Sequence, residues 1–415
     1  MKNSRKLFLT LVYFIPLVAI FSQCLTINKD RPDPRGDIFA GSSTCIKCHR
    51  DVYDNYLRTA HFSTTRLADI HSIGGSFDHG KNEYHFSRDE KVVMEKRKDG
   101  LYQVAYVKGK EIAAQRFDIT FGGVKAESYL YWKGNQTFQL PLSYFKALGW
   151  TNSPGFDSTY VDYGRVIGRR CFECHASYIK DLPMQNQSLR QTESFDKSSV
   201  ILGIDCERCH GPLANHVNYQ TDYPDEKNPK YVATYLSLSR AQRVDMCAVC
   251  HSGNKSRILR SVFAFKPGDT LAHFKEMPLF PEAIDSTKLD VHGNQAQLLA
   301  SSKCFIYSKM DCASCHNVHT NDRGNLASYS QKCMTCHNTV NHNFFPMASS
   351  LGAAIKSNCI DCHMPARSSN VITVETAGKG REVPYLVRTH HIAIYADASQ
   401  KVINYLKAHN KLTSK

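Results

Sequence analysis

Seven copies of the pentapeptide Cys-x-x-Cys-His constrain this 415-residue chain more than any other feature. They use 14 of the 16 cysteines, and we number them motifs 1 to 7 in chain order. The pentapeptide attaches c-type haem, because its two thiols bond the vinyl groups and its histidine reaches the iron. A Cys-x-x-Cys pair can also be a redox dithiol or half of a zinc site, but neither requires a histidine after every copy. The sequence therefore predicts seven covalently attached c-type haems.

The predicted covalent sites are the paired thiols of each motif: Cys45 and Cys48, Cys171 and Cys174, Cys206 and Cys209, Cys247 and Cys250, Cys312 and Cys315, Cys333 and Cys336, and Cys359 and Cys362. The predicted proximal iron ligands are the motif histidines: His49, His175, His210, His251, His316, His337 and His363. Six motifs fall within 193 residues from motif 2 to motif 7, or about 32 residues per haem. So short a segment cannot bury a conventional core around each macrocycle, so we expect the stacked haems to form the core.

The formal net charge of +14 would ordinarily favour a nucleic acid or an anionic surface as partner. Seven haems would bring fourteen propionate carboxylates, which offset that charge. The excess of Lys and Arg is better explained as hydrogen-bonding partners of these carboxylates. We therefore expect no nucleic-acid partner.

Residues 1–23 predict a secretory signal, because a positive start precedes an apolar run at 7–21 that is too short for a typical membrane span. Cys24 follows and resembles the acylated cysteine of a lipoprotein, although Gln23 is larger than the residue usual before it. Cleavage elsewhere and an uncleaved anchor are the alternatives. Residues 24–37 predict a polar linker. We expect an exported protein of the periplasm or cell envelope, lipid-anchored to a membrane.

The remaining chain divides by its patterns into a first haem-binding segment (38–75), a β-rich insertion (76–165), a six-haem domain (166–400) and a C-terminal tail (401–415). Apolar spacing predicts a helix at 51–57. Turn residues at 98–100 and 133–135, each between alternating apolar runs, predict two β-hairpins. Residues 150–168 predict a loop, and the segments after motif 2 predict short helices and loops without strands.

Twelve histidines lie outside the motifs and could bind the second face of an iron. His319, His216 and His342 follow a motif histidine by three to six residues, too few to wrap around a porphyrin, so as ligands they would serve a neighbouring haem. Their alternative role is a hydrogen bond to a propionate or the backbone. His71, His79, His85 and His409 lie in polar surroundings that favour a solvated or packing role, and His273 is evenly balanced.

Several blocks resemble the multihaem cytochromes related to the cytochrome c-554/c-552 domain proteins, over residues 38–396. The more specific blocks are Cys-Glu-Arg-Cys-His-Gly-Pro at 206–212 and His-Gly-Asn-Gln at 292–295. This resemblance implies distal ligands at His61, His216, His292, His319, His342 and His390, with His390 fitting better than His391. One iron then lacks an assigned ligand. His79, His85 or His273 could supply it, or one haem is five-coordinate.

The resemblance implies a mainly α and irregular multihaem cytochrome c fold with a haem-packed core and a small antiparallel β insertion. It also implies a conduit that carries electrons between redox partner proteins at the bacterial cell envelope. The alternative is an oxidoreductase that acts on nitrite, hydroxylamine or a sulfur oxyanion at one five-coordinate haem. No Cys-x-x-Cys-Lys motif occurs, and no acid–base pair stands out beside a motif, so no catalytic residue is assigned and transfer is favoured. Cys304 is expected to be a buried free thiol.

Overall fold

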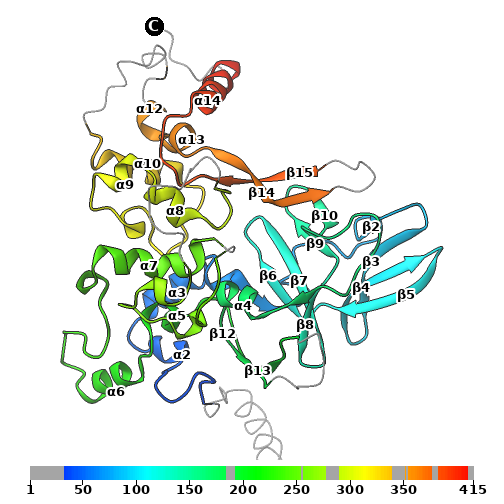
Figure 1. Cartoon of the computed structure of the whole chain (residues 1–415), viewed down its shortest axis with the longest axis horizontal. Coiled ribbons are helices and arrows are strands. Elements are labelled where there is room, and N and C mark those ends of the chain that lie inside the picture. The colour runs from blue at the N-terminus through cyan, green and yellow to red at the C-terminus, as the bar shows by residue number, and fades with distance from the viewer. Residues whose placement is uncertain are drawn as a thin grey trace, which may run out of the picture.

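The computed structural model describes residues 32–183, 192–253, 256–276, 289–338, 351, 354–375 and 382–409. The predicted signal, Cys24 and His342 lie outside these residues. Helical elements that carry the motifs occupy one side of the molecule, and a β-rich unit occupies the other (Figure 1). Within the described ranges, we find no helix with both the length and the apolar character needed to cross a membrane.

The helices are α2 (Ser42–Cys45), α3 (Arg50–Tyr56), α4 (Arg169–His175), α5 (Cys206–His210), α6 (Ala214–Asp222), α7 (Arg240–His251), α8 (Gln295–Ala300), α9 (Lys303–Ile306), α10 (Leu326–Met334), α12 (Ala354–Ser357), α13 (Ile360–His363) and α14 (Ala396–Ala408). The strands are β1 (Thr65–Leu67), β2 (Glu83–His85), β3 (Glu90–Arg97), β4 (Gly100–Val107), β5 (Lys110–Arg116), β6 (Ile119–Gly122), β7 (Ala126–Lys133), β8 (Gln136–Gln139), β9 (Leu142–Phe145), β10 (Gly149–Asn152), β11 (Val166–Ile167), β12 (Ala176–Asp181), β13 (Phe195–Leu202), β14 (Ala366–Glu375) and β15 (Glu382–Arg388). Short 3₁₀ turns connect several of them. The helix predicted at 51–57 is therefore present as α3.

Two antiparallel sheets build the β-rich insertion. One has the order β1-β6-β7-β8-β11 with β9 and β10 attached to β7, and the other has the order β2-β3-β4-β5. Both predicted hairpins are confirmed, as β3–β4 and β7–β8. Gly134 takes a φ of +57°, the left-handed conformation that a two-residue hairpin turn requires at its first position.

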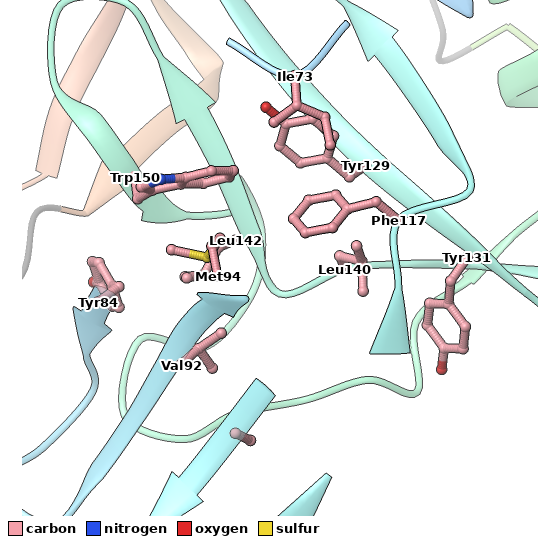
Figure 2. Close-up of a cluster of buried hydrophobic side chains, with 11 residues drawn as sticks. Ile73, Tyr84, Val92, Met94, Phe117, Tyr129, Tyr131, Leu140, Leu142 and Trp150 are labelled. Atoms are coloured by element: carbon pink, nitrogen blue, oxygen red, sulfur yellow. The ribbon is translucent and has the colours of Figure 1, made fainter. Parts of the chain in front are cut away.

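The insertion has its own side-chain core. Apolar side chains from both sheets, among them Met94, Phe117, Tyr129 and Trp150, pack into one buried cluster (Figure 2). Phe117 and Tyr129 meet edge to face with ring centroids 4.9 Å apart. Side-chain packing therefore forms a core in this part of the molecule, in addition to the haem-packed core that the sequence predicted.

The prediction of a mainly α fold with a small β insertion is wrong. About 29% of the structure is helical and about 26% is strand, in several antiparallel sheets. Hairpins β12–β13 and β14–β15 lie in the segment for which no strands were predicted, and β10 and β11 lie in the predicted loop. The pairing of β14 with β15 shifts register between Ser368 and Thr373, and its burial does not alternate. A bulged strand of this kind lacks the period-2 pattern that sequence analysis detects.

Hairpin β14–β15 connects the two sides of the molecule (Figure 1). It begins three residues after His363 and ends two residues before His390. Near its base, Lys125 Nζ donates to the Leu386 carbonyl at 3.0 Å, and the ring of Tyr385 packs on Phe145 with ring centroids 5.9 Å apart. The hairpin thus ties the insertion to two predicted iron ligands.

Candidate haem sites

The motifs lie on single helical turns or at helix ends. Helices α4, α5, α7 and α13 each end at their motif histidine. In the motifs outside longer helices the same turn forms, as in motif 1, where the amide of His49 donates to the Cys45 carbonyl at 2.8 Å. Side chains three and four residues apart share one face of such a turn. Each pentapeptide therefore presents both thiols and its imidazole on one side.

One continuous cavity of about 3580 Å³ collects these sites. All seven motif histidines line it, together with every motif cysteine except Cys362. A pocket for one small cofactor measures about 300–1,000 Å³, so this cavity could hold several such groups. The residues present, thiol pairs and imidazoles around one large space, fit the predicted haems.

Imidazole rings from distant parts of the chain face each other in pairs across this cavity. His61 lies opposite His251 with ring centroids 6.4 Å apart. His319 lies opposite His210 at 6.0 Å, and His390 lies opposite His316 at 6.1 Å. A metal ion binds imidazole nitrogen at about 2.0–2.1 Å, and that nitrogen is about 1 Å from its ring centre, so two axial imidazoles should lie about 6 Å apart. The three spacings match that geometry.

The donor set also fits haem better than a bare ion. Across the described ranges, no three His, Cys, Asp or Glu side chains gather to hold a metal ion by themselves. Pairs of opposed imidazoles instead suit an iron that takes four further ligands from a porphyrin. The Nδ1 atom of His390 is buried without a hydrogen-bond partner in the described residues, so its protein contacts are incomplete.

Two further predicted distal ligands, His292 and His216, also line the cavity, but neither faces another described imidazole at the spacing of the three pairs. After burial, the charge of His292 is the largest cause that lowers the pKa of His175 of motif 2. The Nδ1 atom of His216 shares a hydrogen bond with the Lys230 carbonyl at 2.7 Å. Such a bond fixes the ring and leaves Nε2 as the free nitrogen.

The structure also places the histidines considered for the remaining iron. His79, His85 and His273 do not line the cavity, and His85 instead pairs with Glu83 at 3.2 Å. His391 does line it, with Nδ1 held by the Tyr395 hydroxyl at 3.0 Å. The family resemblance favoured His390 over His391 as the ligand. The structure shows that both residues line the cavity. Cys304 is half-buried and also lines the cavity.

Burial keeps the facing imidazoles neutral. Desolvation lowers the pKa of His175 and of His390 to about 4. It also lowers the pKa of His61, His251 and His319. Neutral imidazole is the form that binds a metal, so these rings are available as ligands at physiological pH.

Contacts between cysteines of different motifs bring the motifs together. The thiols of Cys45 and Cys206 meet, which joins motifs 1 and 3. Equivalent contacts join motif 2 to motif 4, motif 4 to motif 5, and motif 6 to motif 7, through Cys174 with Cys250, Cys247 with Cys312, and Cys333 with Cys359. Groups attached at these thiols would lie side by side.

Two buried carboxylates inside the motifs, which sequence analysis missed, hold these contacts in place. Glu207 of motif 3 accepts hydrogen bonds from the amides of Ala40 and Gly41, just before motif 1. Glu173 of motif 2 accepts from the amide of Val262 at 3.2 Å. An acidic residue between the two cysteines was the available signal, but its partners are distant in sequence.

Comparisons with known proteins agree with these sites. Residues 159–211, which include motifs 2 and 3, match the family model for cytochrome c554 and c-prime. The chain is 26% identical over 179 residues to the multiheme cytochrome MtrA of Shewanella baltica (strain OS185), a match that covers 40% of this chain and 51% of that protein. It thus spans about half the length of that curated relative.

A structural comparison pairs the chain with the crystal structure of the outer cell wall cytochrome OcwA, with a TM-score of 0.49, 16% identity, and coverage of 88% of this chain and 82% of that one. The family-model match covers motifs 2 and 3, whose thiols and imidazoles line the cavity. The two sequence matches and the seven Cys-x-x-Cys-His motifs identify the chain as a multihaem c-type cytochrome.

Proposed function

We propose that this chain is a heptahaem cytochrome that carries electrons between redox partner proteins at the bacterial cell envelope. The observation that carries the proposal is the set of opposed imidazole pairs. In each pair a motif histidine faces a histidine that follows or precedes a different motif. Two imidazoles leave an iron no open face, which suits electron transfer rather than chemistry on a small molecule.

The pairs also interlock neighbouring sites. His319 follows motif 5 but faces His210 of motif 3, and His61 follows motif 1 but faces His251 of motif 4. Each bound haem supplies an iron that gains and loses one electron. Because a histidine near one motif would bind the iron attached at another, the chain holds neighbouring haems in fixed positions. We propose the same role for His292, His216 and His342 at the remaining irons.

The contacts between motifs connect all seven into one branched set, in which motif 4 neighbours motifs 2, 3 and 5. The thiol contacts link motif 1 with 3, motif 2 with 4, motif 4 with 5, and motif 6 with 7. Cys209 of motif 3 lies within electrostatic range of Cys250 of motif 4, and Cys315 of motif 5 within range of Cys333 of motif 6. Every motif therefore has a neighbour, as a conduit requires.

The N-terminal sequence supports a proposed cellular location, and a relative supports the proposed class of partner. We propose that residues 1–23 direct export, that Cys24 carries a lipid, and that the residues up to 37 hold the haem-bearing part off the membrane. The relative MtrA is named as a multiheme cytochrome, which agrees with redox proteins as partners. Metabolic labelling with a radioactive fatty acid, with Cys24→Ala as control, tests the anchor.

A haem count and a spin count test the central proposal. The pyridine haemochrome assay should give seven haems per chain, and electron paramagnetic resonance should show low-spin iron. His319→Ala should convert one iron to a high-spin form, whereas His85→Ala, at an exposed ring outside the cavity, should change nothing. A count of five or fewer haems, or an unchanged spectrum in His319→Ala, contradicts the proposal.

The second candidate function is an oxidoreductase that acts on nitrite, hydroxylamine or a sulfur oxyanion. One observation favours it: among the described rings, no imidazole faces His49, His175 or His337 at the spacing found in the three pairs. A high-spin signal in the wild-type protein that shifts on addition of nitrite or hydroxylamine would support this function over simple transfer.

A further inference from the structure

Two buried cations lie where motifs 2 and 4 meet. Lys275 is 3% exposed, and its Nζ donates to the Val249 carbonyl at 2.6 Å and to the Ser252 hydroxyl at 3.4 Å. Arg208 is 8% exposed and donates to the Glu173 carbonyl at 3.2 Å. Both cations thus contact residues that flank a motif cysteine or histidine.

Shared partners place these cations beside the thiols. The thiol of Cys250 donates to the same Glu173 carbonyl at 3.8 Å that Arg208 contacts. Val249, which accepts from Lys275, directly precedes Cys250. Cys250 in turn meets Cys174 of motif 2. Two positive charges therefore flank the point at which motifs 2 and 4 touch.

The helix that carries motif 4 explains why a lysine can be buried here. Helix α7 ends at His251, and the Val249 carbonyl belongs to its last turn. Carbonyls of the last turn lack intrahelical partners and form the negative end of the helix dipole. The side chain of Lys275 therefore caps the C-terminal end of helix α7.

No carboxylate balances these two cations among the residues described. The carboxylate of Glu173, whose backbone carbonyl Arg208 contacts, already lies 3.5 Å from Arg169 and accepts from the Ser261 hydroxyl at 2.8 Å. The Nε atom of Arg208 is buried without a partner. The junction of motifs 2 and 4 thus carries a buried positive charge that the described protein groups leave uncompensated.

The junction of motifs 1 and 3 has the opposite sign. There Arg35 lies among Asp33, Asp205 and Glu207, at 2.9, 2.8 and 3.2 Å. All four side chains are at most 10% exposed. Three carboxylates around one guanidinium leave a negative excess next to the Cys45–Cys206 contact.

We propose that Lys275, together with Arg208 of motif 3, gives the irons of motifs 2 and 4 the highest reduction potentials in the array, and that the carboxylates around Arg35 hold the potential of motif 1 lower. The inference rests on the proposed haem sites. A nearby cation stabilises the iron state with one positive charge fewer, and burial strengthens the effect because little water screens it. The fixed charges of the chain thereby give the haems at different motifs different reduction potentials.

Charge removal at Lys275 tests this inference in the haem-loaded protein. Lys275→Gln removes the charge and keeps a donor for the Val249 carbonyl, Lys275→Arg keeps the charge, and Lys266→Gln removes an exposed charge as the matched control. A spectroelectrochemical titration measures the potentials, and the haemochrome assay confirms loading. We expect the highest-potential part of the Lys275→Gln curve to move to lower potential, with the arginine variant and the control unchanged.

A fully loaded Lys275→Gln protein with an unchanged curve overturns the inference, as does an equal shift in Lys266→Gln. If Lys275→Gln does not fold, Arg208→Gln should give the same downward shift, and its absence there overturns the inference equally. Wild-type protein that lacks haem refutes the proposed function instead, so the two failures are distinguishable.

Discussion

Replacement of Glu207 by alanine should release the segment that leads into motif 1 from motif 3. The carboxylate is fully buried and accepts from four groups. Three are the backbone amides of Ala40, Gly41 and Leu213, at 2.9, 2.8 and 2.9 Å. The fourth is the guanidinium of Arg35 at 3.2 Å. Three of these bonds, from Arg35, Ala40 and Gly41, join motif 3 to the segment that leads into motif 1.

The cost follows from the partners left behind. A buried donor that loses its acceptor costs about 1–3 kcal/mol, so three orphaned amides cost at least about 3 kcal/mol. Arg35 retains Asp33 and Asp205, so it adds less than the about 3–5 kcal/mol of a fully broken buried pair. We expect the local free energy of opening to fall by about 3–5 kcal/mol, which accelerates amide exchange in residues 36–44 by at least about 100-fold.

Hydrogen–deuterium exchange of the haem-loaded protein, read by mass spectrometry over residues 36–44 and 205–214, measures this opening. Glu111→Ala is the matched control, because its carboxylate is about half exposed and pairs only with Arg97 at 2.8 Å. An exposed pair contributes about 0–1 kcal/mol, so the control should exchange like wild type. If Glu207→Ala binds the full number of haems and exchanges its amides at the wild-type rate, the reasoning is refuted, because the bonds of Glu207 would then contribute no free energy to holding these two segments together.

Three further changes test other parts of the structure. His390→Ala should convert one iron from low-spin to high-spin in electron paramagnetic resonance, because His316 loses its facing ring. Phe117→Ala should cost the insertion about 3–5 kcal/mol and lower its melting temperature in far-ultraviolet circular dichroism, while the haem count stays unchanged. Tyr385→Ala removes an aromatic pair worth about 0.5–1.5 kcal/mol and should speed protease cleavage in hairpin β14–β15.

The haem sites were predictable from sequence where their chemistry is local. A pentapeptide fixes two thiols and an imidazole on one helical turn, so it needs no information from elsewhere in the chain. The facing ligands are not local. His61 faces His251, 190 residues further along, and no spacing rule selects that partner. Chain reach could exclude His316 as the partner of His319, but it could not choose His210.

The missed strands and carboxylates share one physical cause. Hairpins β3–β4 and β7–β8 carry their tight turns in the sequence, whereas the pairing of β14 with β15 is interrupted by a register shift. Glu207 resembles any polar residue between two cysteines until its donors are known. In each case tertiary pairing, rather than local propensity, decides the structure.

The insertion helps to position the haem sites rather than supplying iron ligands. It contains no motif, yet Phe121 of β6 stacks on the His175 ring at 5.0 Å and packs edge to face on Phe172 at 5.3 Å. Three residues beyond β6, Lys125 holds the hairpin that leads from motif 7 to His390. Motif 2 and the base of that hairpin are therefore both attached to one short stretch of the insertion. Because paired strands deform little, this attachment fixes the separation of two parts of the array that the motifs alone leave free.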